Sequence, residues 1–297
     1  MPKITVLMPA YNTRKYIKDA VDSILNQSFK DFEFVIIDDC STDGTLEYLR
    51  GLKDPRIRLI THSSNKGLVY SLNEGLNMAD GKYIARMDSD DISARHRFER
   101  QYAYMEEHPE VGVLGTYMTL YHNSQHIPKP VTHEEICCWQ LFYCCMGHPT
   151  VFMRNSVMQK HKIRYNPDFL HAEDYEIWNR LSEVTRIENL PEYLFAYRMH
   201  KSQVSTSQHH VQNQTADNVR KSLLARLGIS PTEEEYRIHL SFFRYNIPVH
   251  DYEGYSKALA WANKLLEHNQ WKNIYHQETL NRILSYCFTR SESNYPK

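Results

Sequence analysis

The chain has 297 residues, and 35 lysines and arginines stand against 36 aspartates and glutamates, which gives a formal net charge of −1 at pH 7. The lack of a basic excess argues against a nucleic-acid-binding protein. A hydrophobic content of 41% and a charged content of 24% are typical of a globular protein with one large core or two smaller ones. The chain has no apolar run near the roughly 20 residues that span a bilayer, and its N-terminal sequence MPKITVLMPAYN lacks the parts of a signal peptide.

The first half of the chain alternates strand-like and helix-like segments. Short apolar, β-branched runs predict strands, and apolar residues at i, i+3 and i+4 intervals predict helices. The expected strands are residues 4–9, 32–38, 56–61 and 82–88, and the expected helices are residues 14–27, 45–52 and 66–80. This order predicts a largely parallel sheet with helices on both faces, joined by right-handed crossovers.

The second half of the chain is less regular. The expected helices are residues 94–107, 133–146 and 173–184, and the expected strands or extended segments are residues 111–121, 148–154 and 190–200. Beyond about residue 205 the pattern is helical to the end, with breaks near residues 228–231 and 247–251. The six cysteines lack the spacing of a zinc site, so we expect them to be thiols in or near the core.

Two acidic clusters follow strands of the predicted sheet. Asp38 and Asp39 end one strand, and Asp88, Asp90 and Asp91 lie in the segment ARMDSDDIS after another. In parallel α/β sheets, ligands bind at the carboxyl ends of the strands. Three carboxylates in four positions repel one another, and a divalent cation held by oxygen ligands would offset that repulsion. The alternative is that the aspartates occupy solvated turns or cap helices, and we expect Asp91 to cap the helix that follows.

The turn after the first strand excludes two common nucleotide sites. It reads PAYNTR, without the glycines of a dinucleotide-binding turn, and the chain has no P-loop. Aspartates at strand ends can instead accept hydrogen bonds from a uracil imide or a ribose, or ligate a cation that bridges a diphosphate. Nucleotidyltransferases also use paired aspartates and magnesium, although they usually have a glycine-rich loop here. They remain an alternative, as does an inactive nucleotide-sugar-binding scaffold.

Six segments, in consistent order, resemble the inverting glycosyltransferases of family 2, which use nucleotide sugars. They are PAYN (9–12), DDCSTDGT (38–45), NKG (65–67), ARMDSDD (85–91), AEDYEIWNRL (172–181) and YRMH (197–200). Three stretches resemble bacterial β-1,3-galactosyltransferases and β-1,3-N-acetylhexosaminyltransferases of surface-polysaccharide and lipooligosaccharide synthesis. They are ARMDSDDIS, the CC-x-x-HPT stretch of residues 144–150, and EDYEIWNRL followed by NLPEYLFAYR. The chain departs from the family at Cys40, where glycine or serine is common, and at Ala94-Arg95, where a proline often follows the aspartates.

The resemblance implies an α/β fold of the GT-A type, in which a Rossmann-like, mostly parallel sheet is flanked by helices. The GT-A domain would cover residues 1–205, with a nucleotide-sugar-binding half (1–92) and an acceptor-binding half (93–205). Residues 206–297 would form a helical C-terminal region that shapes the acceptor side or docks on a membrane or partner.

The resemblance also assigns residues to the donor nucleotide. Pro9, Ala10, Tyr11 and Asp39 would line the uridine pocket, and Lys66 would lie near the base.

Further positions are assigned to the diphosphate and its metal. Asp88 would contact the ribose or a metal-bound water, and Asp90 would be the main ligand of Mn²⁺ or Mg²⁺. Arg198 and His200 would approach the diphosphate, with His200 as a further metal ligand.

On the acceptor side, the resemblance makes Asp174 the catalytic base. Glu173 would cap the helix or orient the acceptor, because adjacent residues at a helix start are expected to point in different directions. His148 is a further candidate on this side, although it could simply end a turn. Trp178 is expected in the core.

The expected function is therefore inverting, metal-dependent transfer of a hexose from a UDP-sugar to a hydroxyl of a glycan or lipid-linked acceptor, with a β-1,3 linkage. Galactose is the favoured sugar, and N-acetylglucosamine or N-acetylgalactosamine is the alternative. The expected location is the cytoplasm, with peripheral association at the inner face of the membrane and self-association both left open.

Overall fold

The computed structural model describes residues 2–200 and 209–294, and the chain divides into two compact units. The first unit comprises Met1–Val131 and Met146–Gln212, and the second comprises Thr132–Cys145 and Asn213–Lys297. A segment from the middle of the sequence thus groups with the C-terminal helices, which the local sequence pattern did not indicate.

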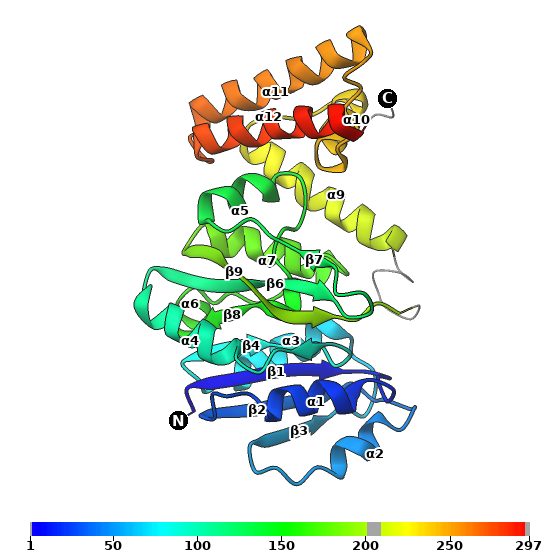
Figure 1. The fold of residues 1–297 in the computed structure, drawn as a ribbon, viewed down its shortest axis with the longest axis vertical. Helices are drawn as coiled ribbons and strands as arrows, with labels where there is room; N and C mark the ends of the chain where they lie inside the picture. Colours follow the sequence, from blue (N-terminus) through cyan, green and yellow to red (C-terminus); the bar gives the residue numbers. More distant parts are fainter. Residues whose placement is uncertain (1, 201–208, 295–297) are drawn as a thin grey trace. The chain divides into compact units, whose positions relative to one another are not determined.

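A nine-stranded sheet forms the centre of the first unit in the part of the chain that the structure describes (Figure 1). Its order is β3-β2-β1-β4-β8-β6-β9-β5, and β7 pairs with β6. The strands are β1 (Ile4–Ala10), β2 (Phe32–Asp38), β3 (Ile57–Thr61), β4 (Tyr83–Arg86), β5 (Ile92–Ser93), β6 (Val111–Leu120), β7 (His126–Ile127), β8 (Phe152–Arg154) and β9 (Arg186–Tyr197). The first four strands are parallel, as predicted, and β5, β7 and β8 add antiparallel pairs.

Helices flank this sheet and connect its strands. They are α1 (Ile17–Leu25), α2 (Thr45–Arg50), α3 (Leu68–Met78), α4 (Arg97–Glu107), α6 (Asn155–Lys160) and α7 (Glu173–Ser182), with 3₁₀ turns η1 (His148–Thr150) and η2 (Pro167–Phe169). The sequence pattern did not indicate α6, β5 and β7. It also predicted a strand from residue 148, where Pro149 lies in the first turn of η1 instead, because proline fixes φ and favours such a start.

Both faces of the central strand β1 are covered, so all seven of its residues are buried. Ile4, Val6 and Met8 share a core cluster with α1 and α4. The intervening Leu7 points to the other face, where a Cβ atom on Gly75 of α3 would lie 2.1 Å from its Cδ1. The glycine therefore allows α3 to approach the sheet closely. Two covered faces leave the carboxyl edge of the sheet as the place where polar groups gather.

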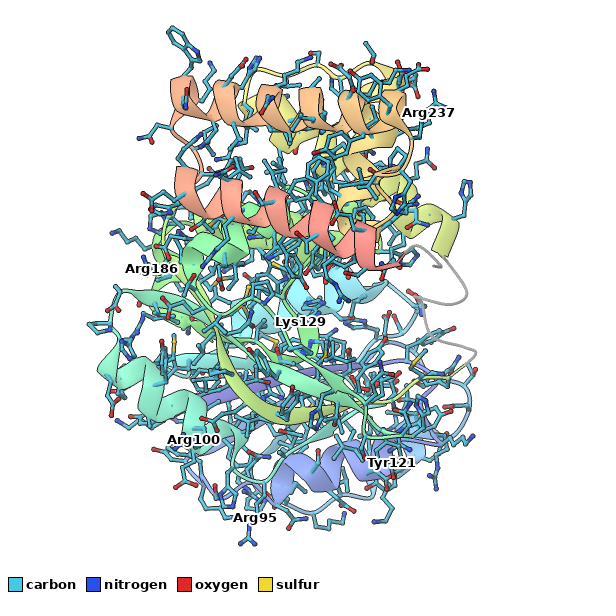
Figure 2. The ribbon with its side chains drawn as sticks, turned by 45° about the horizontal axis from the view of Figure 1, so that its top comes forward. Arg95, Arg100, Tyr121, Lys129, Arg186 and Arg237 are labelled. Atoms are coloured by element: carbon cyan, nitrogen blue, oxygen red, sulfur yellow. The ribbon has the colours of Figure 1, made fainter. Side chains whose placement is uncertain are left out.

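A long-range ion pair joins α4 to β9. Arg100 on α4, labelled in Figure 2, binds Glu192 of β9 with Nη2 at 2.6 Å from Oε1 and Nε at 3.0 Å from Oε2. The two bonds give this pair the planar, two-point geometry that arginine and carboxylate favour.

The second unit is helical in its described residues. Its elements are α5 (His133–Gln140), α9 (His209–Arg226, whose first residues belong to the first unit), α10 (Glu233–Arg244), α11 (Tyr252–Lys272) and α12 (Gln277–Asn294). α5 ends earlier than predicted because the carbonyls that follow it bind the C-terminal helices: His239 Nε2 lies 3.0 Å from Leu141 O, and Arg220 Nε donates to Phe142 O at 2.6 Å. Among the described residues, no helix has the length and apolar character needed to cross a membrane.

Candidate active site

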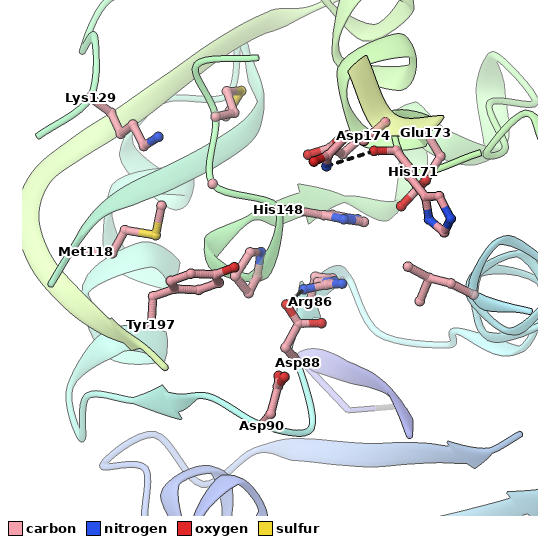
Figure 3. A pocket seen from close by; sticks show the side chains of 15 residues that line it. Arg86, Asp88, Asp90, Met118, Lys129, His148, His171, Glu173, Asp174 and Tyr197 are labelled. Carbon is pink, nitrogen blue, oxygen red and sulfur yellow. Dashed lines mark hydrogen bonds and ion pairs between the residues drawn. The ribbon is translucent and has the colours of Figure 1, made fainter. Parts of the chain in front are cut away.

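A pocket of about 310 Å³ lies in the first unit, beyond the carboxyl end of β4 (Figure 3). Arg86, Asp88 and Asp90 line one wall, and Glu173 and Asp174 at the start of α7 lie across from them. The remaining lining residues are His148, Leu68, Met118, Lys129, Met146, Gly147, Pro149, His171, Tyr197 and Gln212. The structure thus joins two of the predicted motifs, which are more than 80 positions apart in the sequence.

The carboxylates of Asp88, Asp90 and Asp91 lie together, with one oxygen of each within 4.8 Å of the others. Burial and the negative charge of Asp88 raise the pKa of Asp90 above its ordinary value. Burial, Asp88 and Asp90 raise the pKa of Asp91 even more. The protein alone therefore stabilises three negative charges poorly at this place.

Asp91 does not cap α4, contrary to the sequence-based expectation. The residue before α4 is His96, which makes no side-chain capping bond. Asp91 is instead fully buried, and its Oδ1 accepts the backbone N–H of Arg198 at 2.7 Å. Its Oδ2 has no hydrogen-bond partner among the described residues. The aspartate therefore turns toward the acidic cluster, where a buried oxygen is available for a ligand.

Arg86 is the counter-charge of this cluster, and sequence analysis missed it. Its side chain is buried, pairs with Asp88, and lines the pocket. A signal was present in the sequence, because an arginine in a short, otherwise apolar strand must be buried with a partner. The acidic residues directly after the strand supply that partner.

The C-terminal end of β9 brings the YRMH segment to the cluster. His200 Nε2 lies 2.8 Å from Asp90 Oδ2, and its ring stacks on Tyr16 with centroids 4.6 Å apart. Arg198 lies outside the lining of the pocket, since its guanidinium pairs with Asp19 at 3.0 Å. The two residues that were assigned to the diphosphate thus point to different neighbours.

The donor set at this wall fits a hard divalent cation. Mg²⁺ and Mn²⁺ prefer carboxylate oxygens, and imidazole is an accepted additional ligand of Mn²⁺. Asp90 with Asp88 or Asp91 would supply the oxygens, and His200 would supply a nitrogen beside Asp90. Asp91 Oδ2 has no hydrogen-bond partner among the described residues, so it has capacity for a further contact.

Glu173 and Asp174 both line the pocket, whereas we expected only one of them to face it. Glu173 is buried, and burial together with the negative charge of Asp174 raises its pKa to about 7. Asp174 is half-buried, and its Oδ1 accepts the backbone N–H of Tyr175 at 2.7 Å. A carboxyl group that titrates near neutral pH beside a second carboxylate suits proton transfer.

His148 completes the wall next to these acids. Its Nε2 lies 2.8 Å from the hydroxyl of Tyr165, and its ring meets the fully buried Trp178 edge-on. Burial holds the pKa of His148 well below its usual range, so the imidazole is neutral at pH 7. A neutral imidazole can exchange hydrogen bonds with a sugar hydroxyl without adding charge to the pocket. Trp178 lies in the core, as predicted.

The residues assigned to uridine lie along the same edge of the sheet, at the ends of β1 and β2. Pro9 and Ala10 are the last residues of β1, and Ala10 O accepts the backbone N–H of Asp39 at 2.8 Å. Tyr11 follows them and is half exposed. The side chain of Lys66 extends to Tyr70, with Nζ 4.3 Å from the ring centroid.

Asp39 itself is buried and well supplied with donors. Its Oδ1 accepts the backbone N–H of Lys66 at 2.8 Å, and its Oδ2 accepts that of Gly67 at 2.8 Å. His62 Nδ1 lies 2.7 Å from the same Oδ1. Sequence analysis did not single out His62, and a lone histidine after a strand gave no signal of its own.

Comparison with known proteins shows the family of the chain. Residues 5–170 match the family model described as Glycosyl transferase family 2. An uncharacterized glycosyltransferase of Haemophilus influenzae is 35% identical over 246 residues, which cover 77% of this chain and 76% of that protein. The Escherichia coli protein WfgD, named a UDP-Glc:alpha-D-GlcNAc-diphosphoundecaprenol beta-1,3-glucosyltransferase, is 28% identical over 69% of this chain and 80% of its own length.

Solved structures of low sequence identity share the fold. S. aureus TarS 1-349 in complex with UDP-GlcNAc superposes with a TM-score of 0.61 at 20% identity, covering 99% of this chain and 89% of that one. The mannosyltransferase PcManGT from Pyrobaculum calidifontis, in complex with GDP-Man and Mn²⁺, gives 0.61 at 17% identity and covers 99% and 87%. The chain belongs to glycosyl transferase family 2, so it is a glycosyltransferase that uses a nucleotide sugar, and the expected α/β GT-A fold with C-terminal helices is confirmed.

Proposed function

We propose that the enzyme transfers a hexose from a UDP-sugar to a sugar hydroxyl with inversion at the anomeric carbon. The observation that carries the proposal is the pair of facing walls in one pocket. The acidic cluster with Asp90 lies on one wall, and Glu173 and Asp174 lie on the other. A leaving diphosphate at the first wall and an acceptor hydroxyl at the second would be placed on opposite sides of the sugar, as in-line displacement requires.

A divalent cation held by Asp90, with His200 beside it, would supply positive charge to the departing UDP. Within the protein, Arg86 neutralises Asp88, and the backbone N–H of Arg198 holds the orientation of Asp91. Asp174 would take the proton of the attacking hydroxyl. Glu173 would orient the acceptor, since its raised pKa lets it donate a hydrogen bond at neutral pH.

The uridine would bind along the edge formed by Pro9, Ala10 and Tyr11, with its imide N–H directed at Asp39. Asp39 Oδ2 accepts one described protein donor, Gly67 N, and a carboxylate oxygen can accept two. The same atom therefore has capacity for a uracil N–H.

Galactose is the sugar we favour, with a β-1,3 linkage. The name of WfgD supports the linkage and a lipid-linked acceptor, while it places glucose beside galactose as a donor to be tested. TarS binds UDP-GlcNAc in its solved structure, so N-acetylglucosamine is a further donor sugar to be tested. An acceptor carried on a lipid would bring the enzyme to the membrane surface, and Tyr252 and Trp271 of α11 are largely exposed aromatic side chains of the kind found at such surfaces.

A donor screen tests the proposal. UDP-galactose, UDP-glucose, UDP-GlcNAc, UDP-GalNAc and GDP-mannose are each incubated with Mn²⁺ and with water, simple sugars or a lipid-linked GlcNAc acceptor. We expect release of UDP with one hexose donor, and NMR of the product should show a β linkage from an α-linked donor. Transfer from GDP-mannose alone, or an α-linked product, would contradict the proposal.

A further inference from the structure

His62 links the proposed uracil-binding aspartate to a second carboxylate on α3. The residue directly follows β3, and its backbone N–H donates to Asp38 O at 3.0 Å, which fixes it beside the end of β2. Its Nδ1 lies 2.7 Å from Asp39 Oδ1, and its Nε2 lies 2.7 Å from Glu74 Oε2. Ionised carboxylates only accept hydrogen bonds, so both contacts require protons on both ring nitrogens.

The surroundings of the ring favour that doubly protonated form. Asp39 from the end of β2 and Glu74 from α3 flank it, and the Tyr70 ring makes a T-shaped contact with it, with ring centroids 5.4 Å apart. Lys66 brings a positive charge, which lies over the Tyr70 ring. Burial opposes the charged imidazole, but the hydrogen bonds with Asp39 and Glu74 outweigh it and raise the pKa of His62 above its ordinary value.

Glu74 connects this buried group to solvent. Its side chain is 29% exposed, whereas that of His62 is 3% exposed. It lines a second pocket of about 680 Å³ together with Lys66, Gly67 and Tyr70. A proton on the ring can therefore exchange with water by way of Glu74.

We propose that His62 is a positioning residue for the nucleotide: its doubly protonated ring fixes the Asp39 carboxylate against the backbone of Lys66 and Gly67, so loss of one proton weakens uracil binding. The proposal rests on the proposed role of Asp39. When the ring is neutral, only one of its nitrogens carries a proton. In the tautomer that donates to Glu74, Nδ1 presents a lone pair to Asp39, and the repulsion displaces the Asp39 carboxylate. UDP affinity should therefore be highest at pH values below the ordinary pKa of histidine and fall as pH rises through the raised pKa.

Two substitutions of His62 separate its two contacts. In His62→Asn the side-chain amide can replace Nδ1 and donate to Asp39 at every pH, while it gives up Glu74. In His62→Gln the longer amide reaches toward Glu74 instead and gives up Asp39. Glu74→Gln provides a third variant, because its amide can donate to an unprotonated Nε2 and thus satisfies a neutral ring that still donates to Asp39.

The experiment is a calorimetric titration of UDP at constant Mg²⁺ between about pH 6 and about pH 8.5, a range that spans the ordinary histidine pKa of about 6.5 and the region above it. Wild type should lose affinity toward high pH, and His62→Asn and Glu74→Gln should give much flatter profiles. His62→Gln should bind UDP about tenfold more weakly than His62→Asn at every pH, as expected for one lost charge-assisted hydrogen bond. Pyrophosphate, which lacks the uracil, should bind all four proteins with the same pH profile.

The possible failures can be told apart. If wild type does not bind UDP at any pH, the proposed function and this inference both fall. If wild type binds UDP and all four proteins share one pH profile and one affinity, the role of His62 is overturned while the proposed function stands. A shift in pyrophosphate binding that parallels the shift in UDP binding would also overturn it, because the substitutions would then act on the protein as a whole.

Discussion

Asp39 and the Asp88–Asp91 cluster lie at the same edge of the sheet, but their oxygens are satisfied in different ways. The carboxylate of Asp39 receives two backbone N–H groups and the His62 ring. The cluster places three carboxylates within 4.8 Å, holds one buried oxygen without a described partner, and raises the pKa of Asp90 and Asp91. In the first site, the protein itself stabilises the charge of the Asp39 carboxylate, which can also accept a hydrogen bond from an uncharged N–H group. In the second site, a bound cation would offset the repulsion between the carboxylates.

The largest expected effect comes from the acidic cluster. Removal of the cation with EDTA should abolish transfer, and Mn²⁺ or Mg²⁺ should restore it. Asp90→Asn should lower kcat/KM by roughly 10³-fold or more at any metal concentration, because the cation contributes several kcal/mol to stabilisation of the leaving group. Asp22→Asn, which changes an exposed carboxylate on α1, is the matched control and should leave activity unchanged. Full activity in EDTA would remove the metal from the mechanism.

The opposite wall of the pocket should show the next effect. Asp174→Asn keeps the size of the side chain but cannot accept a proton, so kcat should fall by about 10²–10⁴-fold while UDP affinity stays nearly the same. Glu173→Gln should cost much less, because an amide can still orient the acceptor. Steady-state kinetics and UDP titrations of both variants make the comparison. The reverse ranking would assign the base to Glu173, whose raised pKa would then be the catalytic one.

The buried acid of this wall should also make stability depend on pH. The folded protein raises the pKa of Glu173 to about 7, so it binds this proton more tightly than the unfolded chain does. The corresponding stability is present at acidic pH and is lost as pH rises through about 7. Glu173→Gln removes the titration, and its stability relative to wild type should improve by up to about 3 kcal/mol between acidic pH and pH 8. Urea unfolding at several pH values measures the free energy of unfolding of both proteins. Parallel pH curves for wild type and Glu173→Gln would contradict the prediction.

Substitution of Asp39 should have a smaller effect than the changes above. Asp39→Asn turns one acceptor oxygen into a donor, so one of the Lys66 and Gly67 N–H groups loses its partner and the imide N–H of uracil meets a weaker acceptor. UDP affinity should fall about tenfold, and the preference for UDP over GDP should shrink. Asp54→Asn, at a carboxylate that pairs with Arg56, is a control remote from the donor. Equal affinity of wild type for UDP and GDP would refute a base-reading role for this edge.

The same two sites show which features can be predicted from the sequence and which cannot. Alternating apolar runs place Asp39 and Asp88 at strand ends, because periodicity and strand order are local signals. The segment of residues 148–154 and the end of α5 were missed in part because Pro149 and the contacts of Leu141 and Phe142 override local preference. His62 contacts Asp39 and Glu74 contacts His62, and no spacing in the sequence relates the three residues. Pairings made across the fold, such as Glu74 with His62, become visible only in three dimensions.

The smallest expected effect lies next to Asp39, at a position where the chain departs from the family. Cys40 has φ of 64°, in the left-handed region that side chains with a Cβ atom disfavour. Glycine adopts this region without strain, although it loses more entropy on folding. Cys40→Gly should therefore raise the free energy of unfolding by about 0.5–1 kcal/mol, with UDP affinity unchanged because the backbone of Asp39 keeps its conformation. Cys40→Ala retains the Cβ atom and should give no such gain in urea unfolding. If Cys40→Ala stabilises the protein as much as Cys40→Gly does, the strain comes from the cysteine side chain and not from the backbone conformation of residue 40.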